Sequence, residues 1–208
     1  TERVRALSAV FGAYPGITSS IVEFDHAGGV IYSVNSLGSV IRVPDVMTML
    51  RIRAARQAAD GATVYDGVFM AARDATSMPP EAELRKVAES VAKNVEAMAA
   101  APVGEAYAGP VLFEPEAAAQ LFAEVFGSQL MAARKPVSEP GRPLPLPASE
   151  LESRLNSRVL PEWLDVVDDA SLKEWKGQSL AGHYVVDYEG VQPRRLTLVE
   201  KGILKTLY

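Results

Sequence analysis

Cysteine is missing from this 208-residue sequence, and histidine occurs only twice. A chain without cysteine forms no disulfide framework, no thiolate metal site and no cysteine nucleophile. No apolar run approaches the roughly 20 residues that a membrane-spanning helix needs, and the first residues lack the apolar stretch of a signal peptide. These absences predict a soluble protein with no membrane partner, and they fit a cytoplasmic location.

An excess of positive charge is also lacking. The chain carries 21 Lys and Arg against 26 Asp and Glu, a formal net charge of -5. This balance argues against a broad surface for nucleic acid, so we expect no DNA or RNA partner. Neither a Gly-x-Ser-x-Gly nucleophile elbow nor a phosphate-binding loop is present, because no lysine follows Gly28 and Gly29 in the required context.

The first third of the sequence indicates a helix followed by an antiparallel meander. Apolar residues at helical spacing predict a helix over 2–14, and Pro15 ends the pattern. Residues 18–24 and 30–35 favour two strands of a hairpin, with a turn at 25–29. Further turns at 36–38 and 59–61 bring the expected meander to about five or six strands.

An amphipathic helix is the clearest element of the middle third. Six apolar residues recur at helical spacing after two prolines, and Pro102 follows the pattern. They are Leu84, Val87, Ala88, Val91, Val95 and Met98. A short strand at 108–113 and a second helix from Glu114 to about Ala132 are predicted next, with Ala118, Leu121, Phe122 and Val125 toward the core.

The last third contains a proline-rich loop and a hairpin. Five prolines between residues 135 and 147 predict an irregular loop. Alternation from Arg195 to Tyr208 predicts a C-terminal hairpin. We therefore expect an α+β fold, in which an antiparallel meander sheet is covered by amphipathic helices, as one domain over 1–208. Because the sequence starts at Thr1 and the last strand stops at the terminus, we expect a fragment of a longer chain.

Three stretches of the sequence, in order, resemble the TldD/PmbA family, also called modulators of DNA gyrase. They are residues 35–61, residues 106–128 and residues 190–202. Active members of that family carry a helix with His-Glu-x-x-x-His, in which the histidines bind zinc and the glutamate is the general base. The resemblance therefore implies a middle segment of a zinc-peptidase-like protein whose metal-site helix lies near residues 114–132.

The two histidines of that motif are absent. The aligned residues are Ala123, Glu124, Val125, Phe126, Gly127 and Ser128. A methyl group cannot bind zinc, and a serine hydroxyl is a poor substitute for imidazole. We therefore expect no metal or other cofactor in this chain and treat Glu124 as a vestige of the catalytic base or an exposed helix carboxylate. Gly127 either lets the backbone pass close to a metal site or is a tolerated helix glycine.

Three hypotheses of function follow from the resemblance. The first is a non-catalytic subunit of the TldE/PmbA type that binds peptide or assembles with a TldD-like paralogue, or with itself as a dimer. The second is an active zinc metallopeptidase whose ligands were altered or come from regions outside this sequence. The third is an interaction module that modulates DNA gyrase.

The acidic residues Asp165, Asp168 and Asp169 fit a solvated turn better than a cation site.

Overall fold

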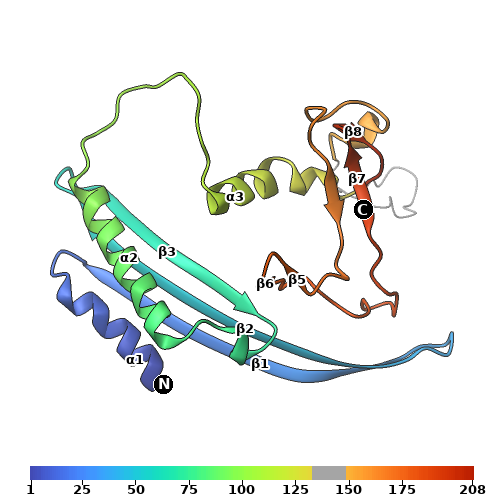
Figure 1. Ribbon diagram of the computed structural model, residues 1–208, viewed down its shortest axis with the longest axis horizontal. Coiled ribbons are helices and arrows are strands. Elements are labelled where there is room, and N and C mark those ends of the chain that lie inside the picture. The colour runs from blue at the N-terminus through green and yellow to red at the C-terminus, as the bar shows by residue number, and fades with distance from the viewer. Residues whose placement is uncertain (133–148) are drawn as a thin grey trace, which may run out of the picture. The chain divides into compact units, whose positions relative to one another are not determined.

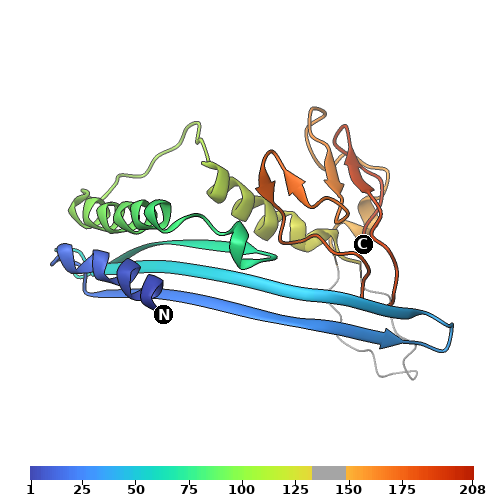
Figure 2. The same ribbon diagram turned by 60° about the horizontal axis from the view of Figure 1, so that its bottom comes forward.

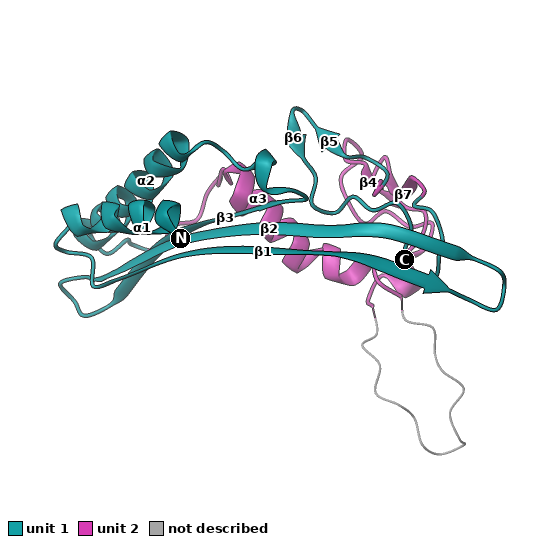
Figure 3. Ribbon diagram, turned by 90° about the horizontal axis from the view of Figure 1, so that it is seen from below, with its two compact units in different colours: residues 1–105, 171–193 teal, residues 106–170, 194–208 magenta. Residues whose placement is uncertain are grey.

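The computed structural model describes residues 1–132 and 149–208 and divides the chain into two compact units (Figure 3). Unit 1 comprises residues 1–105 and 171–193, and unit 2 comprises residues 106–170 and 194–208. Each unit contains helices and an antiparallel sheet, which confirms the α+β class. The proline-rich loop predicted at 135–147 lies outside the described residues.

A three-stranded antiparallel sheet forms the centre of unit 1, in the order β1-β2-β3. Its strands are β1 (Ser19–Val34), β2 (Val40–Gln57) and β3 (Thr63–Ala72). β3 pairs only with residues 48–57 of β2, so β1 and β2 continue beyond it as a two-stranded ribbon (Figures 1 and 2). The sheet of unit 1 is therefore three strands wide at one end and narrows to two strands at the other.

Two helices cover one face of this sheet. They are α1 (Glu2–Ser8), which continues into the 3-10 helix η1 (Ala9–Ala13), and α2 (Glu81–Ala100). The buried core joins Leu7 of α1, Leu50 and Ile52 of β2, and Leu84 and Val91 of α2. The 81–100 helix and the opening helix are therefore confirmed, and Arg51 and Arg53 lie on the opposite, exposed face.

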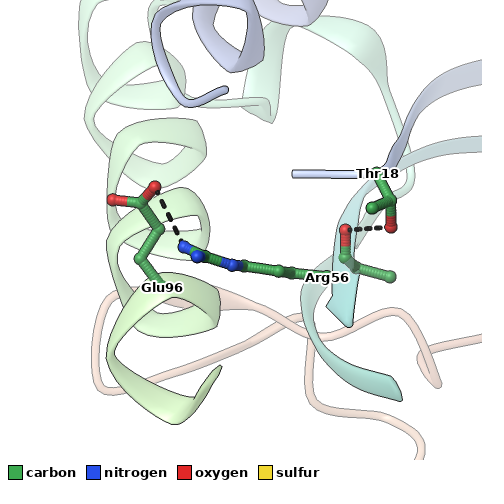
Figure 4. Close-up of polar contacts among 4 residues, drawn as sticks. Thr18, Arg56 and Glu96 are labelled. Carbon is green, nitrogen blue, oxygen red and sulfur yellow. Dashed lines mark hydrogen bonds and ion pairs between the residues drawn. The ribbon is translucent and has the colours of Figure 1, made fainter. Parts of the chain in front are cut away.

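Polar contacts join α2 to the sheet and order the segments next to both. Arg56 Nη1 lies 3.5 Å from Glu96 Oε1 of α2, and Thr18 Oγ1 donates to the Ala55 carbonyl at 3.2 Å (Figure 4). Before α2, Asp74 caps the 3-10 helix η2 (Ala75–Ser77). The hydrogen bond from the Thr76 side chain has the largest effect in lowering the pKa of the Asp74 carboxyl, and the bond from the Ser77 side chain lowers it further. The Arg56–Glu96 pair, in which both side chains are half-buried, contributes little beyond orientation.

The expected turn at 25–29 is wrong. Residues 25–29 lie inside β1 and pair with residues 45–49 of β2, so the sheet has three long strands in place of five or six short ones. Gly28 and Gly29 adopt extended backbone, which glycine does as readily as a turn. The actual turn follows Val34, where the Asn35 side chain accepts from the amides of Leu37 and Ser39.

Unit 2 contains a smaller sheet in the order β4-β7-β8. Its strands are β4 (Val166–Asp168), β7 (Leu196–Glu200) and β8 (Ile203–Leu204), and the predicted C-terminal hairpin is β7-β8. Leu130, Leu198, Val199 and Leu204 form its buried core. Residues 108–113, which the structure describes, lie outside any strand, so the strand expected there is wrong.

The remaining regular elements are short. Unit 2 also contains α3 (Pro115–Val125) and the 3-10 helices η3 (Gly127–Leu130) and η4 (Glu152–Arg154). Unit 1 contains the two-stranded pair β5 (Glu174–Trp175) and β6 (Gln178–Ser179). No helix in the described part of the chain is long and apolar enough to cross a bilayer.

Candidate functional site

The degenerate motif, defined as residues 123–128, lies at the end of α3 and the start of η3. Ala123 and Glu124 are in the last turn of α3, and Gly127 and Ser128 begin η3. The backbone leaves regular helix at Phe126, where φ is −116°. In an unbroken α-helix, positions five apart point about 140° away from each other. The break at Phe126 therefore sets the direction of Ser128 relative to Ala123.

The Ser128 hydroxyl satisfies the end of the helix. Its Oγ donates to the Glu124 carbonyl oxygen at 3.0 Å. This is one of the carbonyls that a helix leaves without an internal partner at its C-terminus. Gly127 does not need to be glycine for space within this chain, because a Cβ there would lie 3.6 Å from the Phe122 carbonyl oxygen, an ordinary contact.

These residues do not fit a zinc ion. A zinc site needs three or four nitrogen, sulfur or carboxylate ligands, and this segment offers the exposed Glu124 alone. Across residues 1–132 and 149–208, no three His, Cys, Asp or Glu side chains are grouped as metal ligands would be. His26 Nδ1 instead lies at 2.9 Å from the buried Thr48 Oγ1 in the sheet. The Asp165 carboxylate accepts from the Lys201 amide.

The apolar side of α3 is exposed. The sequence predicted Ala118, Leu121, Phe122 and Val125 toward a core, but none of the 11 residues of α3, all of which the structure describes, is buried. Leu121 is 44% and Val125 67% exposed. The Phe122 ring centroid lies 5.2 Å from that of Phe126 in the next turn, and Phe122 is 40% exposed. An amphipathic helix with an uncovered apolar side favours a partner surface.

A second candidate site lies in unit 1, where the segment 183–188 runs along the β1-β2 ribbon. The two leave a groove of about 720 Å³ between them. Ribbon residues Ile31, Ile41 and Val43 contribute aliphatic side chains, and the segment contributes Tyr184 and Tyr188. The groove therefore joins two parts of the sequence that are more than a hundred residues apart.

Arg73, directly after β3, holds the two walls of the groove together. Its Nη1 lies 3.1 Å from Asp45 Oδ1 on the ribbon, and its Nη2 donates to the His183 carbonyl oxygen at 2.7 Å. The buried Nε has no hydrogen-bond partner among the described residues. A planar guanidinium that donates in two directions fixes both neighbours at once.

Gly190 brings the same segment against the ribbon. Its φ is +86°, and a Cβ at this position would lie 2.8 Å from Ile41 Cδ1. The preceding turn is organised by Asp187, whose Oδ1 accepts from the amides of Glu189 and Val191. Two independent contacts, at Arg73 and at Gly190, therefore position the segment.

Replacing Arg73 by methionine should loosen the segment 183–188. The change keeps much of the aliphatic stem but removes both hydrogen bonds, which together stabilise the contact by about 1–3 kcal/mol. Hydrogen exchange should show faster exchange for amides in 183–191, with β7 unchanged. Arg42→Met is the matched control, because Arg42 donates to the Tyr32 hydroxyl on the same ribbon and makes no hydrogen bond to residues 183–191 within the described ranges. Unchanged exchange in Arg73→Met would show that the guanidinium does not hold the segment.

Sequence reasoning found the α3 motif but missed the groove. Arg73 directly follows β3, and His183 lies 110 residues later in the sequence, so no local pattern connects them. The structure also places both histidines in unit 1, whereas α3 belongs to unit 2. A charged residue at a strand end is the only local signal for Arg73, and it is too common to identify a site.

Comparison with known proteins gives one family. Residues 106–208 match the model of the PmbA/TldA metallopeptidase C-terminal domain. No curated protein matches the chain by sequence.

Solved structures match over nearly the whole chain. A proposed modulator of DNA gyrase from Bacteroides thetaiotaomicron is 13% identical, with a TM-score of 0.69 over 100% of this chain and 43% of that one. A proposed modulator of a DNA gyrase from Thermotoga maritima is 15% identical, with a TM-score of 0.66 over 99% and 44%. TldE from Thermococcus kodakarensis is 15% identical, with a TM-score of 0.54 over 99% and 42%.

The chain therefore spans less than half the length of each of these structures. At such low identities the structural likeness establishes the shared fold, and the family match over 106–208 adds the sequence pattern. The resemblance of residues 35–61 and 190–202 agrees with both. The chain belongs to the TldD/PmbA family of metallopeptidase-related proteins.

Proposed function

We propose that this chain is part of a non-catalytic subunit of a zinc metallopeptidase system, contributing peptide binding or assembly. The observation that carries the proposal is the sequence resemblance at the end of α3, which aligns Ala123 and Ser128 with the histidine positions of the family motif. The Ser128 hydroxyl donates a hydrogen bond to the Glu124 carbonyl oxygen and so caps the C-terminal end of α3. A general base of this kind acts on a metal-bound water, and the motif around Glu124 has no histidine to hold the metal.

The proposed partner is a TldD-like paralogue. Hydrolysis by this kind of enzyme needs neutral imidazoles to hold the metal and a carboxylate to take a proton from the bound water. A second copy of this chain would add another Ala123 and another Ser128, so self-association alone would not complete such a site. A histidine-bearing relative supplies what this chain lacks.

The exposed side of α3 supports an assembly role. Leu121, Phe122 and Val125 form an exposed apolar side of α3. Exposed apolar patches of this kind are typical of interaction surfaces. Assembly through α3 would bring the degenerate motif next to the partner and leave the chemistry to that partner's own histidines.

Zinc content and peptide cleavage test the proposal together. The purified chain alone should hold no stoichiometric zinc and should not cleave peptides. Mixing it with a histidine-bearing family member should form a complex and change that member's cleavage rate by about tenfold or more, equivalent to about 1.4 kcal/mol in the barrier. A partner whose motif histidines are replaced by alanine is the control and should bind without cleaving.

Three results would contradict the proposal. Stoichiometric zinc and cleavage by the chain alone would reveal an active enzyme with another set of ligands. The absence of any complex with the histidine-bearing relative would remove the subunit role. A complex with an unchanged cleavage rate would show that the chain contributes nothing to the reaction.

A further inference from the structure

We propose that the groove between the ribbon and the segment 183–188 binds the C-terminal end of a peptide. In this arrangement an apolar terminal side chain lies against the ribbon, and the terminal carboxylate interacts with Lys173. The inference rests on the proposed function in that the ligand is a peptide, but the groove belongs to unit 1 and the α3 motif to unit 2.

The size and lining of the groove suit an apolar side chain. Its volume of about 720 Å³ lies within the range of about 300–1,000 Å³ that is typical of ligand pockets. Ile31, Ile41 and Val43 line the ribbon side, and β-branched side chains of this kind are stiff and keep their shape. Tyr32 and Tyr184 add ring surface together with hydroxyl groups.

The charges around the groove leave one cation uncompensated. The Asp45 carboxylate is paired with Arg73, and the Asp187 carboxylate accepts from two backbone amides. Lys173 also lines the groove, and it makes no ion pair with any residue of the described ranges. A ligand carboxylate is the complement to such an ammonium group.

A C-terminal apolar residue carries both required features on one residue. Its side chain supplies apolar surface, and its carboxylate supplies the negative charge directly beside it. A nucleic acid would bring many phosphates to a chain whose formal net charge is -5, which disfavours that occupant. We therefore assign the groove to a free peptide end.

The walls of the groove are positioned before any ligand binds. Arg73 connects the ribbon to His183, and the close packing of Gly190 on Ile41 holds the other end of the segment. A site built in advance avoids the entropic cost of ordering its walls on binding. This arrangement makes measurable binding by the chain alone an expected property.

Calorimetry with short synthetic peptides tests the assignment. The probe is an N-acetylated four-residue peptide ending in leucine with a free carboxylate, and its comparators are the C-terminal amide and the peptide ending in alanine. The free acid should bind about tenfold or more tightly than the amide, and Lys173→Gln should abolish that difference. Lys176→Gln is the matched control, because Lys176 lies over the Trp175 ring outside the groove.

A second variant tests the apolar wall without relying on charge. Val43→Thr preserves shape but places a hydroxyl in the groove, so it should reduce the preference for leucine over alanine. Circular dichroism should show that both variants are folded. Equal binding of acid and amide, no effect of Lys173→Gln, or no binding of either peptide would overturn the assignment. Those results would leave complex formation with a histidine-bearing relative intact, whereas loss of that complex alone would overturn only the subunit role.

Discussion

Alanine in place of Gly202 should unfold unit 2 at room temperature or bring it close to unfolding. Gly202 has a φ of +75°, and a Cβ there would overlap the Leu160 carbonyl oxygen and lie 2.7 Å from that of Pro161. Both obstacles are backbone atoms, so no side-chain rotation relieves them. The Gly202 amide donates to the Leu164 carbonyl at 2.9 Å, and its carbonyl accepts from Val159. A shift of the turn would therefore break these bonds.

The expected loss is about 3–5 kcal/mol, at the high end for a single substitution. Hydrogen exchange at Val199 and Leu204, both buried in the core of unit 2, should accelerate, while β2 in unit 1 keeps its protection. Gly177→Ala is the control. Its φ is +82°, but a Cβ there would meet nothing within 4 Å, so only backbone strain of about 1–2 kcal/mol applies. Equal losses in the two variants would show that the contact with residues 160 and 161 is unimportant.

The regular periodic parts of the fold could be predicted from the sequence. The helix at 81–100 follows directly from spacing, because its apolar residues recur on one face and that face is buried in the core of unit 1. The pairing of residues 25–29 with 45–49 could not be predicted, because Gly28 and Gly29 allow both a turn and a strand. The pairing with residues 45–49 of β2, which lie about 20 residues away in the sequence, selects the strand over the turn.

The two candidate sites differ in the same way. The α3 motif was found because its residues are consecutive and match a family pattern. The groove depends on Arg73, Asp45 and His183, which come from three separate segments and are joined only by folding. The resemblance at 190–202 gains a physical meaning in the structure, since its glycines at 190 and 202 each allow a close contact, one in each unit.

Leu84→Ala should destabilise unit 1 by about 3 kcal/mol. Leu84 is 0% exposed in the first turns of α2, within the core formed with Leu50 and Ile52 of β2. Removing a fully buried leucine side chain loses its transfer free energy and leaves a cavity, which together cost about 2–5 kcal/mol. Urea denaturation should show a lower midpoint for the unfolding of unit 1.

The matched control is Leu37→Ala, because Leu37 is 90% exposed in the turn between β1 and β2. It should change the unfolding free energy by less than about 0.5 kcal/mol. A comparable loss in both variants would mean that the β1-β2 turn, and not the helix-covered core, limits the stability of unit 1. The distinction matters for the groove, since its ribbon wall extends from the part of the sheet that α2 covers. If α2 anchors the sheet, Leu84→Ala should also weaken peptide binding as denaturant rises, whereas Leu37→Ala should leave it unchanged.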